Sequence, residues 1–224
     1  MNEGATLAER LHVVRDGVTD ASREASRDVS TITTIVVTKF HAASLVRELH
    51  ELGVRDFGES RHQEAQPKVA ELSDLDATWH FVGQLQSKKG RQVASYIDVL
   101  HSMDRDSLAD ALAGSTLDVF LQVNLTDDPG RGGVAPHDVL RLAERMLSID
   151  GLTLRGLMAV APVGVEPRAA FAGVRALSEG LRVLAPTASD LSIGMSGDYR
   201  DAILEGATHL RIGTAITGIR PTAG

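Results

Sequence analysis

The sequence contains no cysteine among its 224 residues. Disulfide bonds, thiolate nucleophiles and cysteine-ligated zinc or iron–sulfur centres are therefore excluded. Acidic residues outnumber basic ones: the sequence has 23 lysines and arginines but 30 aspartates and glutamates, which gives a net charge of -7. A nucleic-acid-binding protein needs a basic surface to neutralise phosphates, so we expect no nucleic-acid partner.

A targeting segment and long apolar runs are missing as well. The first ten residues show no basic stretch followed by an apolar core, unlike a secretory signal. The longest apolar run, 157–165, is interrupted by a proline and a glycine and is too short to span a bilayer. We therefore expect a cytoplasmic protein with no membrane partner. The content of 43% hydrophobic and 24% charged residues is typical of a globular protein.

Short apolar runs alternate with stretches of helical periodicity along the chain. An amphipathic helix is expected over 6–26, and further helical segments over 43–52, 137–148 and 168–184. The runs typical of strands lie near 31–38, 54–57, 78–82, 97–100, 117–124, 152–160, 190–193 and 208–212.

Eight strands that alternate with helices predict an α/β fold, a parallel (β/α)8 TIM-like barrel with an extra N-terminal helix. The alternative, a doubly wound open sheet, should carry a glycine-rich dinucleotide turn after its first strand, and no such turn is present. Because no linker or low-complexity tract interrupts the chain, we expect residues 1–224 to form a single domain.

Lys39 ends the first of these runs, which is rich in β-branched residues and typical of a buried strand. A lysine at the mouth of a barrel is expected to be partly desolvated, which favours the uncharged amine that attacks carbonyl groups. Schiff-base lysines arise in this way. A structural lysine paired with a carboxylate is the alternative interpretation of this residue taken alone.

Glycine-containing turns follow the seventh and eighth predicted strands, with Ser196 in the first turn and Gly213 and Thr214 in the second. In TIM barrels these two loops form the usual phosphate site, because helix starts leave backbone N–H groups unpaired. Ser196 could instead only cap the helix that follows it. Since strand eight closes against strand one, Lys39 and these turns should frame one pocket, and Arg211 should point into it.

Other polar side chains also lie where predicted strands end. Asn124 and Met158 follow or end strands five and six and are expected to contact a ligand at the same mouth. His80 and His101 either line this pocket or only form hydrogen bonds at the barrel rim, and both interpretations stay open. The histidines lack the spacing of metal ligands, so no metal site is expected.

A strand-end amine, an anion site and an arginine match the needs of pyridoxal 5′-phosphate. This cofactor requires an amine for its aldehyde, backbone and hydroxyl donors for its phosphate, and a partner for its ring nitrogen. The pattern of residues therefore predicts pyridoxal 5′-phosphate as the cofactor.

Several motifs, in a fixed order along the chain, carry a family resemblance. They are VVTK at 36–39, FGESRHQE at 57–64, WHFVGQLQ at 79–86, HSMDR at 101–105, GLM at 156–158, and the segments 191–198 and 211–218. Through them, the chain from about residue 31 to 220 resembles the pyridoxal phosphate homeostasis proteins, once called the proline synthetase co-transcribed family. These proteins in turn look like the N-terminal barrel of alanine racemase.

The resemblance implies a role for each candidate residue. Lys39 matches the Schiff-base lysine, and Ser196, Gly213 and Thr214 match the phosphate-binding positions. Arg211 matches the arginine that faces the pyridine nitrogen. An arginine there keeps the ring nitrogen unprotonated, because guanidinium does not give up its own proton, and the cofactor becomes a weaker electron sink.

The chain departs from the family pattern at three positions. Serine stands at Ser60 and Ser87, where the family usually has asparagine, and Thr217 replaces the usual phenylalanine. These differences concern contacts at the rim of the expected pocket.

Two functions of different classes suit such a site. The resemblance implies an intracellular carrier or buffer that holds pyridoxal phosphate and passes it to apo enzymes, with no robust catalysis of its own. The alternative is an amino-acid racemase or lyase, and a phosphate-sugar barrel enzyme is a third possibility by fold analogy alone.

A racemase needs a second base on the opposite face of the cofactor, which in alanine racemases is a tyrosine from a C-terminal β domain. This sequence runs only to Gly224 after its last predicted strand, and Tyr96 and Tyr199 fall at helix-start or loop positions. We therefore expect a carrier rather than an enzyme. The resemblance favours a monomer.

Overall fold

A closed parallel barrel forms the centre of the molecule. The computed structural model describes residues 4–126, 128 and 130–219. Its eight strands pair in chain order, and the last pairs with the first. They are β1 (Thr33–Val37), β2 (Asp56–Glu59), β3 (Thr78–Phe81), β4 (Val99–Met103), β5 (Leu117–Val123), β6 (Leu152–Ala159), β7 (Asp190–Met195) and β8 (His209–Ile212). The predicted (β/α)8 barrel is confirmed, with strand bounds displaced by a few residues at most.

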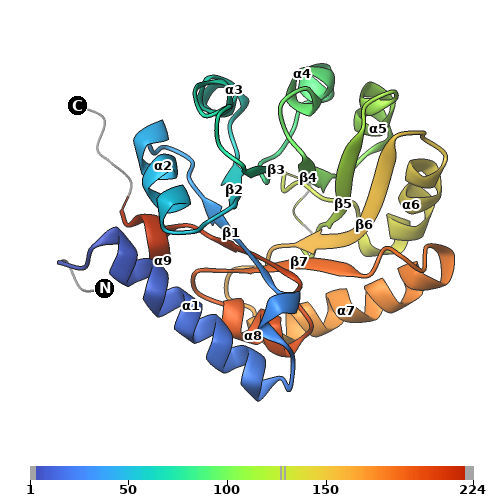
Figure 1. The fold of residues 1–224 in the computed structure, drawn as a ribbon. Coiled ribbons are helices and arrows are strands. Elements are labelled where there is room, and N and C mark those ends of the chain that lie inside the picture. Colours follow the sequence, from blue (N-terminus) through green and yellow to red (C-terminus); the bar gives the residue numbers. More distant parts are fainter. Residues whose placement is uncertain (1–3, 127, 129, 220–224) are drawn as a thin grey trace.

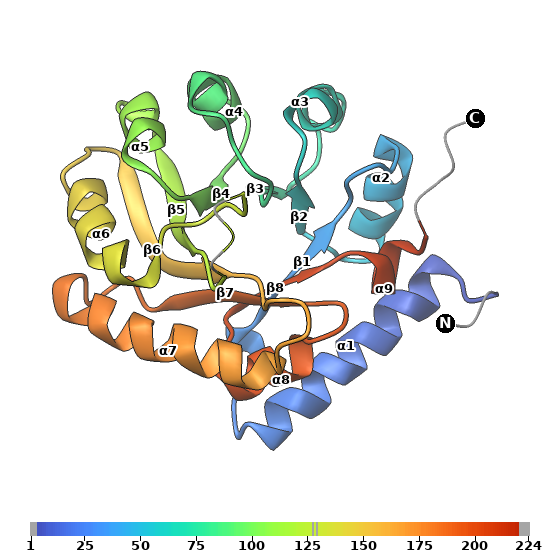
Figure 2. The same ribbon diagram turned by 180° about the vertical axis from the view of Figure 1, so that it is seen from behind.

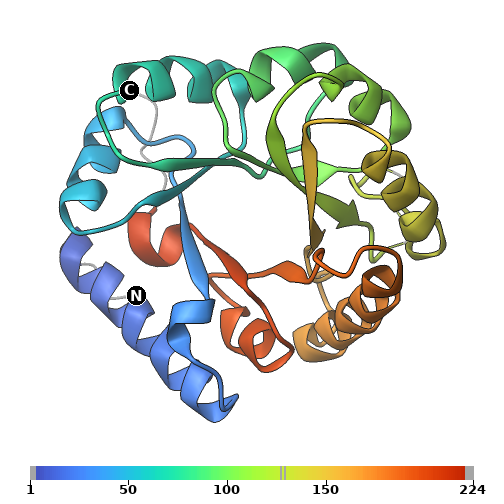
Figure 3. The ribbon, with the colours of Figure 1, turned by 45° about the vertical axis from the view of Figure 1, so that its right-hand side comes forward.

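Helices form a ring outside the strands (Figure 3). They are α1 (Leu7–Glu24), α2 (Ala43–Glu51), α3 (His62–Glu71), α4 (Gly90–Ala94), α5 (Asp106–Leu112), α6 (Val139–Leu147), α7 (Pro167–Leu184), α8 (Tyr199–Leu204) and α9 (Thr214–Thr217). Short 3-10 turns add η1 (Val29–Thr31), η2 (Ser87–Lys89) and η3 (Pro136–Asp138). Among the described helices, none combines the length and the hydropathy needed to cross a membrane.

The extra N-terminal helix α1 lies across the outside of the barrel next to α8 and α9 (Figures 1 and 2). It begins with a capping box, in which the Thr6 hydroxyl accepts from Glu9 N at 3.2 Å and the Glu9 carboxylate accepts from Thr6 N at 2.7 Å. Gly17 allows α8 to come close, because a Cβ there would lie 2.1 Å from the Tyr199 hydroxyl. The apolar stripe that α1 buries is Leu7, Leu11, Val14, Val18 and Ala21.

The strands bury apolar side chains outward and many polar ones inward. Outward-facing residues pack beneath the helices and include Val36, Phe57, Trp79, Leu100, Leu121 and Leu157. Inside the barrel, Val99, Phe120 and Met158 form a separate apolar cluster. Because parallel strands alternate their faces, the next inward positions place histidine, serine and arginine side chains along the barrel axis.

Candidate cofactor site

The register between β1 and β8 sets the position of Lys39. Val36 pairs with Ile212, so the chain after β1 runs beside the chain after β8 at the C-terminal mouth of the barrel. A Cβ placed on Gly213 would lie 3.7 Å from the Cβ of Val37, which confirms that the two strand ends are adjacent. Lys39, two residues beyond β1, and Gly213 therefore belong to the same mouth.

Lys39 itself is exposed. The expectation that its amine is desolvated by burial is therefore wrong, because the side chain lies beyond the end of the strand, where water reaches it. Its ammonium lies 5.9 Å from the centre of the Phe40 ring, and none of the ion pairs between described residues includes it. The alternative of a lysine paired with a carboxylate is also not what the structure shows.

A buried ion pair anchors the backbone directly before Lys39. Lys68 of α3 donates to the Glu59 carboxylate at 2.5 Å and to the Thr38 carbonyl oxygen at 2.9 Å. The Thr38 hydroxyl donates to the same Glu59 oxygen at 2.7 Å. Burial raises the pKa of the Glu59 carboxyl, and the charge of Lys68 opposes that rise. Because Thr38 precedes Lys39, this cluster fixes where the lysine leaves the strand.

Residues after β7 lie at the same mouth, since Met195 pairs with Arg211 of β8. Gly194 makes the turn possible: its φ is +92°, and a Cβ there would lie 2.6 Å from the Ala202 Cβ. Ser196 follows and is partly buried.

Ser196 does not cap the helix that follows it. The N-cap of α8 is Asp198, whereas the Ser196 hydroxyl accepts a hydrogen bond from Ala215 N at 3.3 Å, in the first turn of α9. The alternative interpretation of Ser196 as a cap of its own helix is therefore corrected: the hydroxyl links the loop after β7 to the helix after β8.

Backbone N–H groups of the turns after β7 and β8 lie near the Ser196 hydroxyl. Gly213 is the N-cap of α9, and the first N–H groups of a helix have no partner within the helix. In the described part of the chain, the N–H groups of Gly197, Gly213 and Thr214 donate to no other residue. A Cβ on Gly197 would meet nothing within 4 Å, so the space beside this turn is open. Unpaired N–H groups beside a hydroxyl suit an anion such as phosphate.

Arg211 lies inside the barrel below this mouth and is only 5% exposed. Its Nη1 donates to the carbonyl oxygen of Ser192 at 2.6 Å and to the Ser192 hydroxyl at 2.7 Å, and its Nη2 donates to Ala159 O at 2.9 Å. Of the five N–H groups of a guanidinium, two are left for another partner. Burial lowers the pKa of Arg211 to about 10, with Asp198 opposing, so the group stays charged at neutral pH.

The remaining predicted residues lie in two other environments. Met158 is buried in the interior apolar cluster, and His80 is buried deeper in the barrel, where it contacts Asp56 at the first residue of β2. Asn124 is engaged in its own loop: its amide donates to Asp128 O at 3.0 Å, and its oxygen accepts from the Thr126 hydroxyl at 2.7 Å. The structure does not bring Asn124 or His80 into contact with Lys39.

Both tyrosines lie in the helical layer. The Tyr96 hydroxyl forms a 3.0 Å hydrogen bond with His62 Nδ1, and burial raises its pKa. Tyr199 packs against Gly17 of α1.

Sequence reasoning missed His41, two residues beyond Lys39 in the loop after β1. Burial, followed by the positive charges of Lys68 and Arg10, lowers the pKa of His41 and favours a neutral imidazole at the mouth. The only signal in the sequence is its closeness to Lys39, since it belongs to no motif.

The three departures from the family pattern have local partners. Ser87 shares a 3.0 Å hydrogen bond with Ser107, and the Thr217 hydroxyl donates to Gly213 O at 3.2 Å, which supports the turn after β8. Ser60 lies against Gly83, where an added Cβ would be 2.1 Å from the Ser60 carbonyl oxygen.

The fold and this site define a class: a (β/α)8 barrel with a strand-end lysine, an anion site after β7 and β8, and a buried arginine at one mouth. Residues 22–221 match the family described as alanine racemase, N-terminal domain. The chain is 41% identical over 222 residues to the pyridoxal phosphate homeostasis protein of Pseudomonas aeruginosa, with 96% of each chain covered. It therefore belongs to the family of the pyridoxal phosphate homeostasis proteins, as the motifs indicated.

Solved structures agree with this assignment. The structure of PipY of Synechococcus elongatus PCC7942 with PLP bound is 37% identical, covers 95% of this chain and 100% of its own, and superposes with a TM-score of 0.83. Alanine racemase of Corynebacterium glutamicum is only 13% identical, with a TM-score of 0.71 over 96% of this chain and 63% of the racemase. That likeness shows the shared barrel fold alone.

Proposed function

We propose that this protein binds pyridoxal 5′-phosphate covalently through Lys39 and acts as a carrier or buffer in cofactor homeostasis. The observation that supports the proposal most directly is the meeting, toward one end of a closed barrel, of the exposed Lys39 amine, backbone N–H groups without a partner among the described residues, and the buried Arg211 guanidinium. When bound, pyridoxal phosphate supplies an aldehyde that reacts with amines and a ring that withdraws electrons.

Each residue then has a defined task. Lys39 would hold the cofactor, because its amine is placed to form a Schiff base with the aldehyde. The Ser196 hydroxyl and the N–H groups of Gly213 and Thr214 donate to the phosphate. Arg211 would offer an unused N–H group to the ring nitrogen and, because the guanidinium remains charged at neutral pH, would favour the unprotonated form of that nitrogen.

A carrier role is supported by what surrounds Lys39. Its exposure allows water or an incoming amine to reach the bond and release the cofactor. A racemase would need a second acid–base group opposite the lysine. Tyr96 and Tyr199 are engaged in the helical layer, and His80 and His101 are buried in hydrogen bonds with one another.

One observation favours the alternative, an amino-acid racemase or lyase. His41 is a partly buried histidine in the same loop as Lys39, with a lowered pKa that suits a general base. If this alternative holds, turnover should depend on His41.

Two measurements separate these functions. Loaded protein should restore the activity of an apo pyridoxal-phosphate enzyme, whereas the Lys39→Ala variant should not. L-alanine and other amino acids in deuterated water should show little exchange of the α-proton. Turnover of about 1 per second or faster would favour the enzyme instead, and its loss in His41→Ala would assign the base.

We also propose, from the family resemblance, a monomeric single-domain protein of the cytoplasm whose partners are apo pyridoxal-phosphate enzymes. Sedimentation of the purified protein, alone and with such an enzyme, would test the oligomeric state and the partner.

A further inference from the structure

A continuous chain of hydrogen bonds runs through the inside of the barrel. Its members are Asp56, His80, His101, Ser192 and Arg211, each from a different strand. The Asp56 carboxylate lies 3.1 Å from His80 Nε2, and His80 Nδ1 lies 3.0 Å from His101 Nε2. His101 Nδ1 lies 2.8 Å from the Ser192 hydroxyl, which accepts from Arg211 Nη1 at 2.7 Å. The chain thus joins the N-terminal half of the barrel to the candidate cofactor site.

The two ends fix the direction of every bond in this chain. Arg211 can only donate, so the Ser192 oxygen accepts from it. The single hydroxyl proton of Ser192 must then go to His101, because a buried hydroxyl without an acceptor is unfavourable. His101 Nδ1 therefore carries no proton.

The same argument fixes the tautomers of both histidine rings. A neutral His101 with a bare Nδ1 carries its proton on Nε2 and donates it to His80 Nδ1. His80 then also carries its proton on Nε2 and donates it to the Asp56 carboxylate, which can only accept. The charged groups at the ends thus specify the same tautomer for both histidines.

We propose that Ser192, His101, His80 and Asp56 are positioning residues for Arg211: their one-directional hydrogen bonds hold the guanidinium in the orientation that it presents to the ring nitrogen. The link to the ring nitrogen rests on the proposed function, whereas the tautomers do not. Successive bonds that point the same way polarise one another, so the Ser192 oxygen becomes a stronger acceptor for Arg211.

The surroundings of His101 support a neutral ring. Its ring is fully buried and stacks on Phe120, with centroids 4.6 Å apart. The charged or titratable groups that face it are His80, His209 and Arg211, and with burial they lower its pKa well below the ordinary range. A protonated His101 would point an N–H group at Ser192 and break the chain.

Further charged groups lie toward the N-terminal end of the barrel. Arg155 bridges Asp190 at 2.8 Å and Asp118 at 3.2 Å. Burial lowers the pKa of His209 to about 4; the positive charges of His80 and Arg155 act in the same direction, whereas the carboxylates of Asp190 and Asp56 oppose it. Among the described residues, the ion pairs of Arg155 are with Asp118 and Asp190, whereas the Asp56 carboxylate contacts His80 Nε2.

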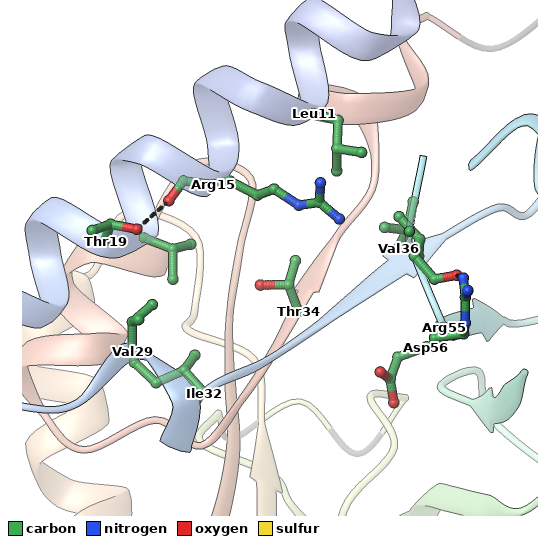
Figure 4. A pocket seen from close by; sticks show the side chains of 12 residues that line it. Leu11, Arg15, Thr19, Val29, Ile32, Thr34, Val36, Arg55 and Asp56 are labelled. Atoms are coloured by element: carbon green, nitrogen blue, oxygen red, sulfur yellow. Dashed lines mark hydrogen bonds between the residues drawn. The ribbon is translucent and has the colours of Figure 1, made fainter. Parts of the chain in front are cut away.

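The Asp56 end of the chain can be changed without touching the cofactor site. Asp56 is the first residue of β2 and lines a cavity of about 450 Å³ between α1, β1 and β2, together with Arg15 and Thr34 (Figure 4). This cavity lies beside β1 and the segment that leads into β2, and Lys39 is not among the residues that line it. Asp56→Asn keeps an oxygen acceptor for His80, and Asp56→Ala removes it.

Nitrogen-15 NMR of the cofactor-free full chain tests the tautomers directly. Both His80 and His101 should show a protonated Nε2 and a bare Nδ1, and Asp56→Asn should keep this pattern. Asp56→Ala should alter the His80 signals. A protonated Nδ1 on His101, or an imidazolium at His80 at neutral pH, would reverse the chain and overturn the proposal.

The effect on Arg211 is read from the absorption spectrum of the loaded protein. Ser192→Ala and Asp56→Ala should each shift the cofactor band or its pH midpoint. Ser102→Ala is the matched control, because Ser102 is also a fully buried barrel serine, and its hydroxyl has no partner among the described residues. It should leave the spectrum unchanged.

The outcomes distinguish the positioning role of these residues from the proposed carrier function. If Ser192→Ala and Asp56→Ala both bind the cofactor with the parental spectrum and pH midpoint, the positioning role is wrong and the carrier function stands. If the parent protein binds no cofactor, the carrier function fails, while the NMR pattern still decides whether the chain exists.

Discussion

Replacing Lys68 with methionine should destabilise the fold by about 3–5 kcal/mol, the usual effect of breaking a buried ion pair. The side chains of Lys68 and Glu59 are 7% and 2% exposed, so methionine leaves a carboxylate almost out of reach of water. Two hydrogen bonds from a charged donor disappear, to Glu59 and to the Thr38 carbonyl. At about 1.5–3 kcal/mol each, they account for a loss of the same size.

Urea unfolding at two pH values provides the assay. The orphaned Glu59 should take up a proton more readily in the folded than in the unfolded state, so low pH favours folding. The deficit of Lys68→Met should therefore be larger at about pH 8 than at about pH 5. Lys89→Met is the matched control, since within the described residues the Lys89 ammonium donates to the Gln92 side chain at 3.3 Å, and it should change stability by less than about 0.5 kcal/mol.

A double variant, Lys68→Met with Glu59→Leu, should recover much of the loss, because an apolar pair of similar size needs no counter-charge. A loss below about 1 kcal/mol in the single variant, independent of pH, would refute this reasoning. Cofactor affinity should fall along with stability, because Thr38 and Lys68 set the position of Lys39.

Three further predictions concern the phosphate site, the turn before it and the barrel interior. Ser196→Ala should weaken pyridoxal phosphate binding by roughly tenfold to a hundredfold, from about 1.5–3 kcal/mol, in a titration where pyridoxal without phosphate is little affected; equal losses would argue against a phosphate contact. Gly194→Ala should destabilise the fold by about 1–3 kcal/mol because of its φ of +92°, whereas Gly180→Ala in α7, with open space around it, should stabilise by up to about 1 kcal/mol. Burial lowers the pKa of His209 to about 4, so the unfolded chain binds a proton at a higher pH than the folded chain does. Roughly 3 kcal/mol of stability should therefore be lost as the pH falls from about 6.5 to 4. The variant His209→Asn should reduce this loss in acid unfolding curves.

The barrel was predictable because its strands are short β-branched runs with regular helical segments between them. The closeness of Lys39 to Gly213 also followed, since a closed barrel brings the first and last strands together. Other details depend on where a strand stops. Lys39 lies two residues past the end of β1, and no periodicity distinguishes that exposed position from a buried one.

The side-chain contacts inside the barrel could not be predicted from the sequence, for a different reason. Whether His80 meets Asp56 or a ligand depends on register between strands, and a shift of one residue turns a side chain to the opposite face. The partner of Ser196 likewise follows from the packing of two loops that are distant in sequence. The motif resemblance assigned Ser196 to the phosphate site but did not indicate its hydrogen bond with Ala215.

Borohydride reduction of the loaded protein, followed by peptide mass mapping, tests the central claim most directly. Reduction should fix the pyridoxyl group on the peptide that contains Lys39, and Lys39→Ala should lose both the label and the yellow colour. A label found mainly on Lys68, Lys88 or Lys89, or an undiminished label in Lys39→Ala, would contradict the account.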